Sequence, residues 1–238
     1  MAQNIPIENP DFDDGFNQHE GIGELTVPNG WLPWWRQGNP EEVAQGYLKR
    51  PEYALEEQRV HAGRYAAKLF TTFATHDAGL YQQIPVPIGA LLALTAEVQY
   101  WSEHTDGTGG GYGMQVGIDA GPTTMPSPDC VWGPWRGQDD LNWDGNTWRT
   151  VYVTYLCDTP LVTLYLRGLC RFRAKHNDSY WDHVVLEAEV ANTPPDDLLE
   201  YLRLVEEQSR KIGERIQEII ELFGKPIAPS FLPPNGGD

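Results

Sequence analysis

The chain has 238 residues, of which 40% are hydrophobic and 21% are charged, and it contains 24 glycines and 19 prolines. This loop-rich balance suits an all-β globule and disfavours a helical bundle or a disordered chain. The 34 Asp and Glu residues outnumber the 17 Lys and Arg residues, which gives a formal net charge of −17. The electrostatic field of this negative charge repels phosphate backbones and anionic lipids, so nucleic acid is disfavoured as a partner.

The N-terminal segment has neither a basic start nor an apolar run, and nowhere do about 18 apolar residues follow one another. We therefore expect synthesis in the cytoplasm, no export signal and no membrane insertion. The three cysteines are too few and too unevenly spaced for a disulfide framework or a zinc site; they are Cys130, Cys157 and Cys170.

Residues 1 to 192 alternate short β-like runs with clusters of Gly, Pro, Asn and Asp, which is typical of a β-sandwich domain. The clearest strand runs from residue 92 to residue 101. Alternation predicts that one of its faces lies in the core, namely Leu92, Leu94, Ala96, Val98 and Tyr100. A second strand follows at 113–119. A hairpin is then predicted from strands 148–157 and 161–167, with its turn at 158–160.

The pattern of residues 193 to 224 predicts one long helix. It begins at the N-cap Thr193, which is followed by Pro194 at the first helical position, and it ends at Gly224. Residues 225 to 238 are rich in Pro and Gly and predict an extended tail. Apolar residues recur along the helix with heptad spacing, which predicts a coiled coil, with a trimer favoured. This oligomerisation seam consists of Leu198, Leu202, Val205, Ile212, Ile216, Ile219 and Phe223. The alternative is that the helix packs on its own sandwich.

Four short segments occur in a recognisable order: NPDFDDG at 9–15, VHAGRYAAK at 60–68, GLYQQI at 79–84 and YWDHVVL at 180–186. In this order they resemble the jelly-roll carbohydrate-binding module superfamily, over about residues 5 to 190. The resemblance implies a jelly-roll β-sandwich that binds a glycan or polysaccharide.

The same resemblance implies a structural Ca²⁺ ion where the first and last strands lie together. Carried over by position, its ligands would be the carboxylates of Asp13 and Asp182, with backbone carbonyls near Gly63. Carboxylates and carbonyls of an irregular loop are the oxygen ligands that Ca²⁺ prefers. The alternative is that the two acids cap turns or pair with Arg64 or Lys68.

A sugar ring stacks its C–H face on an aromatic plane and needs polar side chains at its edge. Strand alternation places such residues opposite the core, and we predict that they form a glycan platform: Gln99, Trp101, Gln115, Tyr152, Tyr165 and Arg167. The alternative is that they are ordinary half-exposed cross-strand residues. A second aromatic group predicts either a small core under long loops, which we favour, or a loop-end site. It consists of Trp31, Trp34, Trp35, Trp132, Trp135, Trp143 and Trp148.

Catalytic patterns are weak, because the sequence contains no histidine pair at metal-ligand spacing and no GxSxG motif. We therefore predict a non-catalytic carbohydrate-recognition protein, made multivalent by its coiled coil. The alternative is a structural component of a virion or another surface assembly, in which the sandwich is a rigid head and the helix attaches it to partners.

Overall fold

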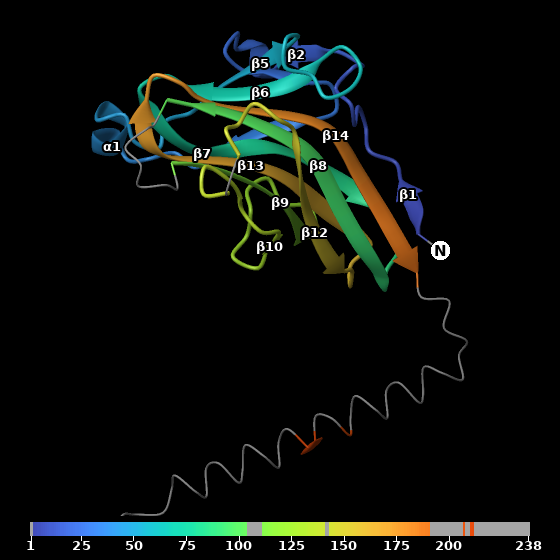
Figure 1. Ribbon diagram of the computed structural model, residues 1–238. Coiled ribbons are helices and arrows are strands. Elements are labelled where there is room, and N and C mark those ends of the chain that lie inside the picture. Colours follow the sequence, from blue (N-terminus) through green and yellow to red (C-terminus); the bar gives the residue numbers. More distant parts are fainter. Residues whose placement is uncertain (1, 104–110, 141–142, 191–206, 208–209, 212–238) are drawn as a thin grey trace, which may run out of the picture. The chain divides into compact units, whose positions relative to one another are not determined.

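The computed structural model describes residues 2–103, 111–140, 143–190, 207 and 210–211. The chain divides into two compact units, Met1–Ala191 and Asn192–Asp238. The first unit is an antiparallel β-sandwich, with two sheets packed face to face (Figure 1). None of the helices in the described residues has the length and apolar composition needed to span a membrane.

One sheet has the strand order β12-β8-β14-β6-β5, and β1 also pairs with β14. We call it the β14 sheet. Its strands are β1 (Gln3–Ile5), β5 (Glu52–Glu56), β6 (Ala66–Thr71), β8 (Ala90–Ser102), β12 (Arg149–Leu156) and β14 (Asn177–Val190). Every pairing in this sheet is antiparallel.

The other sheet, called here the β13 sheet, has the order β10-β9-β13-β7-β4, and β11 also pairs with β9. Its strands are β4 (Leu32–Trp35), β7 (Ala74–Pro85), β9 (Tyr112–Ala120), β10 (Val131–Trp132), β11 (Arg136–Gly137) and β13 (Leu161–Ala174). Three small elements lie outside both sheets: the β2 (Phe16–Gln18) and β3 (Thr26–Pro28) ribbon, the 3₁₀ turn η1 (His19–Gly21) and helix α1 (Pro40–Ala44).

The core between the sheets follows the predicted alternation. The inward set predicted on β8 is confirmed, because Leu92, Leu94, Ala96 and Val98 are fully buried and Tyr100 nearly so. The strand predicted at 113–119 is confirmed as β9, whose Met114, Val116 and Ile118 side chains are also fully buried. Alternating apolar residues on antiparallel strands thus build one shared core.

The hairpin predicted around residues 158–160 is wrong. β12 pairs with β8 in the β14 sheet, whereas β13 pairs with β7 and β9 in the β13 sheet. The connection is instead an arch between the sheets. It is held by hydrogen bonds from the Gly89 amide to the Cys157 carbonyl (2.7 Å) and from the Val86 amide to the Pro160 carbonyl (3.0 Å). Cys130, Cys157 and Cys170 are buried free thiols.

The C-terminal helix, its oligomerisation seam and the tail lie outside the described residues, apart from three positions. Glu207, Arg210 and Lys211 are helical, and the Lys211 ammonium lies 2.7 Å from a Glu207 carboxylate oxygen. The predicted seam residues Leu198, Leu202, Val205, Ile212, Ile216, Ile219 and Phe223 all belong to the part that is not described.

Candidate functional site

The six residues predicted to form one platform lie on two different outer faces. Gln99, Trp101 and Tyr152 come from β8 and β12, at positions that alternate with the core of the β14 sheet. Gln115, Tyr165 and Arg167 come from β9 and β13 and point outward from the other sheet. The two sets are separated by the thickness of the sandwich. We call these surfaces the β14 face and the β13 face.

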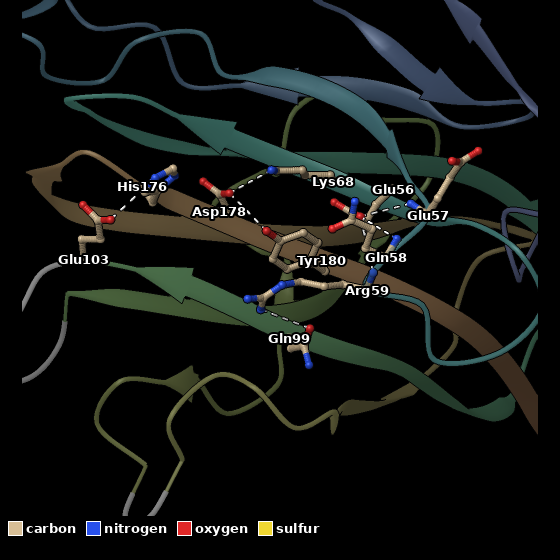
Figure 2. Close-up of polar contacts among 10 residues, drawn as sticks. All are labelled: Glu56, Glu57, Gln58, Arg59, Lys68, Gln99, Glu103, His176, Asp178 and Tyr180. Carbon is tan, nitrogen blue, oxygen red and sulfur yellow. Dashed lines mark hydrogen bonds and ion pairs between the residues drawn. The ribbon is translucent and has the colours of Figure 1, made fainter.

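On the β14 face, Arg59 and His176 contact Trp101. The His176 ring stacks on the Trp101 indole with 4.0 Å between centroids and 11° between planes. The Arg59 guanidinium lies 5.4 Å from the Trp101 centroid and 4.9 Å from that of Tyr180. It also donates a 3.4 Å hydrogen bond to Gln99 Oε1, as Figure 2 shows. Trp101 is therefore engaged by its own neighbours.

An acidic residue organises the rest of this face. Asp178 is 2% exposed, and its Oδ2 accepts from the Lys68 ammonium at 2.9 Å and from the Tyr180 hydroxyl at 3.1 Å (Figure 2). Burial, reinforced by the Asp178 charge, raises the pKa of Tyr180.

Tyr152, which is 50% exposed, pairs across the strands with Thr95. Thr95 lies six residues from Trp101 along β8, or about 20 Å. Tyr152 and Trp101 therefore do not form one compact subsite.

Asp13 and Asp182 both bind the loop that joins β5 to β6. Asp182 Oδ2 accepts from the amides of His61 (2.8 Å) and Ala62 (3.1 Å). Asp13 Oδ1 accepts from the amides of residues 64 (2.8 Å) and 65 (3.0 Å). Gly63 lies between the two anchor points with a φ of +74°, and a Cβ there would meet Asp13 Oδ2 at 2.1 Å. Two acids that are far apart in the sequence thus clamp one short loop.

This arrangement does not fit a calcium site as the side chains are placed. Asp182 is fully buried, its second oxygen accepts from the His183 amide at 2.8 Å, and burial raises its pKa. The carboxylates thus face N–H donors, whereas Ca²⁺ needs six to eight oxygen ligands. Within the described residues, no group of three or more His, Cys, Asp or Glu side chains could hold a metal. The geometry is that of acids capping a turn.

Calcium binding stays a prediction that a melting experiment decides. If the amide hydrogen bonds alone hold the loop, the Tm should be the same in 5 mM EDTA and in 5 mM CaCl₂. A Tm that rises with CaCl₂, and that stops responding in Asp182→Asn, would establish a cation at this position instead.

The β13 face carries a small aromatic core of its own. Trp34, Tyr81, Cys130 and Tyr165 form a buried cluster outside the β13 sheet, with Trp132 packed against it. Tyr165 is completely buried, and its hydroxyl lies 2.8 Å from Thr123 Oγ1. The favoured interpretation of the second aromatic group is therefore confirmed for Trp34, which is 3% exposed, whereas Trp132 is only partly buried. Trp31 and Trp143 belong to the main core, and Trp148 contacts the His61 ring.

Trp132 and Trp135 lie on two glycines of β9. A Cβ on Gly117 would meet the Trp132 ring at 2.6 Å, and one on Gly113 would meet the Trp135 ring at 3.0 Å. The Arg167 guanidinium lies between the two indoles, 5.0 Å from the Trp132 centroid and 5.1 Å from that of Trp135. Because the glycines have no side chains, the rings approach the strand closely. Trp135 remains 39% exposed.

The position of Arg167 is fixed by a buried acid. Its Nε and Nη2 each donate to one carboxylate oxygen of Asp77, both at 2.7 Å, and the Asp77 side chain is only 4% exposed. Arg36, which is 65% exposed, lies 3.7 Å from the same carboxylate. With its amide oriented to satisfy both neighbours, Gln115 accepts from Arg167 Nη1 at 3.0 Å and donates to the Gly133 carbonyl at 3.1 Å. The guanidinium is thus held in a bidentate fork.

The three platform residues on the β13 face therefore support the surface and do not form it. Tyr165, Gln115 and Arg167 support the β13 face from below, and the indoles of Trp132 and Trp135 form its surface. Neither Asp77 nor the two glycines was predicted from the sequence. The signal was present in YGMQVGIDA, because glycines at alternating outward positions of a strand mark a close approach of other groups.

The chain matches no protein-family model and no curated protein sequence. Among solved structures, a Stig cyclase from Fischerella sp. TAU in complex with (3Z)-3-(1-methyl-2-pyrrolidinylidene)-3H-indole is similar, with a TM-score of 0.50 and 19% identity. The match covers 81% of this chain and 100% of that chain. At this identity the likeness is one of fold, the antiparallel β-sandwich described above.

Carbohydrate-binding modules are also among the structural neighbours. TmCBM61 in complex with β-1,4-galactotriose has a TM-score of 0.46 and 11% identity, over 77% of this chain and 97% of that chain. The CBM22-1 xylan-binding domain of Paenibacillus barcinonensis Xyn10C has a TM-score of 0.42 and 10% identity, over 81% and 95%. At these identities the likeness is one of fold.

Proposed function

We propose that this chain is a non-catalytic carbohydrate-binding protein, and that a glycan stacks on the indoles of the β13 face. The observation that carries the proposal is the pair Trp132 and Trp135, laid on Gly117 and Gly113 with Arg167 between them. The fold likeness to carbohydrate-binding modules is consistent with it but carries none of the argument.

The physical case rests on preorganisation. Aromatic rings offer sugars a large apolar surface, and rigid ones do so at little cost in conformational entropy. The two glycines lie four positions apart on β9, or about 13 Å, so the indoles are spaced along the strand direction. This spacing favours an oligosaccharide chain over a single sugar.

The same contacts favour binding over turnover. Among the described residues, two acids of this face are buried. Asp77 has both carboxylate oxygens engaged by Arg167, and Arg36 lies beside one of them. Asp119 accepts from the Ser127 amide at 2.7 Å and from the Ser127 hydroxyl at 2.8 Å. A general acid or base has to exchange a proton with a substrate, and Asp77 is committed to guanidinium groups instead. Asp77 thus positions Arg167 under the indoles, and Asp119 holds the loop at Ser127.

The test compares two tryptophans of equal exposure on opposite faces. Trp135 and Trp101 are each 39% exposed, so replacing either with Ala costs little core packing. We expect Trp135→Ala to weaken binding to a glycan-array hit by about tenfold or more, since a stacked aromatic ring and its desolvated surface are lost. Isothermal titration calorimetry with that glycan measures the effect.

Trp101→Ala is the matched control and should bind normally. A loss confined to Trp101→Ala would move the site to the β14 face, where Gln99, Trp101 and Tyr152 were predicted to act. An array without any binder would contradict the carbohydrate proposal itself. Multivalency through residues 193–224, and the alternative role in a virion or other assembly, stay predictions.

A further inference from the structure

A cavity of about 80 Å³ opens beside the exposed indole of the β13 face. Its walls include Trp135, Arg136, Asp139, Asp140, Leu169 and Arg171. A water molecule needs about 10–15 Å³ of such a volume, so the cavity has room for a small polar substituent. A sugar stacked on Trp135 would hold its substituents at this cavity.

Arg136 contributes a buried donor that lacks a partner. Its Nε is buried without a hydrogen-bond partner among the described residues, while its Nη1 lies 3.5 Å from Asp140 Oδ1. Buried donors are nearly always satisfied by protein or water, and leaving one unpaired is costly. The Arg136 Nε–H is therefore available to donate to water or to a ligand group in the cavity.

Arg171 adds a second cation to the same wall. It is exposed on β13, four positions after Arg167, and its guanidinium pairs with no carboxylate within the part of the chain that the structure describes. Asp140, by contrast, is committed: Oδ1 faces Arg136 and Oδ2 accepts from the Gly137 amide at 3.2 Å. The cavity thus presents two arginines, one with an orphaned N–H, against the single exposed carboxylate of Asp139.

We propose that this cavity takes the carboxylate of an acidic sugar whose ring or neighbour stacks on Trp135. The inference rests on the proposed function and names its ligand class. Guanidinium groups hold carboxylates in a planar, charge-assisted geometry, and a carboxylate matches the cavity in size and charge. The formal net charge of −17 disfavours a dense polyanion. The ligand class is therefore a largely neutral glycan that carries isolated uronic or sialic acids.

The test uses matched glycan pairs that differ by one acidic group. An array and calorimetry compare 3′-sialyllactose with lactose, and glucuronic-acid-substituted xylotetraose with xylotetraose. Each acidic glycan is also tested after carboxyl reduction. We expect the wild-type chain to prefer the acidic member of at least one pair by about tenfold, which is the effect of one or two charge-assisted hydrogen bonds. Carboxyl reduction should abolish the preference.

Arg136→Gln and Arg171→Gln should each reduce that preference to about twofold or less and leave binding of the neutral member unchanged, since the stacking surface is intact. Arg64→Gln, which removes one exposed positive charge outside the β13 face, is the matched control and should keep the preference. Because Arg171 is exposed, its variant tests the cavity even if Arg136→Gln fails to fold.

Two results overturn the inference while the proposed function survives. One is equal or tighter binding of the neutral member in every pair that binds. The other is an acidic preference that persists in both arginine variants. If no glycan binds in any form, the proposed function fails together with the inference.

Discussion

Replacing Arg167 with Met should lower the free energy of unfolding by about 3–5 kcal/mol, because it leaves a buried carboxylate without its partner. Asp77 has a 4% exposed side chain, and Arg167 supplies both of its short hydrogen bonds. Arg36 is 65% exposed and lies 3.7 Å away, so solvent screens the compensation it offers. Urea unfolding at pH 7 measures the loss.

A double variant separates the ion pair from the packing. Asp77→Leu combined with Arg167→Met removes both charges at similar volume, and such replacements of buried ion pairs are often neutral or stabilising. Most of the loss should therefore be recovered. Glycan binding should not return, because the guanidinium that lies between Trp132 and Trp135 is gone from both variants.

Arg59→Met is the control on the opposite face. Arg59 also lies over two aromatic rings, but its side-chain hydrogen bond goes to neutral Gln99 at 3.4 Å. Its loss should cost about 1 kcal/mol or less. If Arg167→Met were no more destabilising than Arg59→Met, the buried pair would not be what fixes the β13 face.

The strands could be predicted from the sequence because their signal is local. Leu94 to Tyr100 alternates without a break, and burial of one face follows directly from that pattern. The sheet to which each strand belongs is not a local property. β12 and β13 are separated by four residues, and those residues can form either a tight turn or an arch between sheets.

That topological choice explains the divided platform. Alternation along a strand predicts only whether a side chain points toward the core or away from it. Trp101 and Arg167 are therefore both predicted to point away from the core. Because β12 and β13 belong to different sheets, their outward side chains point to opposite faces of the sandwich. The residues were identified correctly as outward-facing, and their grouping on one face was wrong.

The supporting residues were harder to predict for a different reason. Asp77 lies in the mixed polar and apolar segment ATHDAG of β7, which contains no Lys or Arg that would indicate a cation partner. Arg167 lies 90 positions away and reaches Asp77 because β7 pairs with β13, with Gly79 opposite Arg167. Such long-range charge pairs become visible only when register is known.

One more core residue, His76, should have a large effect on the pH dependence of the free energy of unfolding. It is fully buried, its Nδ1 lies 2.9 Å from Thr71 Oγ1 and its Nε2 lies 2.9 Å from the Tyr112 hydroxyl. Burial lowers the pKa of His76 from 6.5 to about 3. Burial also raises the pKa of the neighbouring Cys170 to about 12 and that of Tyr112 well above its usual value, so both stay neutral in acid.

The folded state therefore excludes a proton that the unfolded state accepts below pH 6.5. Stability should be fully present above pH 6.5 and should fall by about 1.4 kcal/mol for each pH unit below it, until the folded-state pKa near 3 is reached. At pH 5 the loss from this residue is about 2 kcal/mol. The raised pKa of Asp182 acts in the opposite sense, because that carboxyl favours its proton in the folded state.

Comparison of the wild-type chain with His76→Gln isolates the contribution of the imidazole. The amide keeps a donor and an acceptor near Thr71 and Tyr112 but does not titrate, so the difference in unfolding free energy should narrow steadily from pH 6.5 to pH 4.5. Urea unfolding at intervals of half a pH unit gives that slope, in which the other titrating groups cancel. His19→Gln, at a short surface turn, should keep the wild-type slope. A pH-independent difference for His76→Gln would mean that the buried imidazole takes up a proton in the folded state.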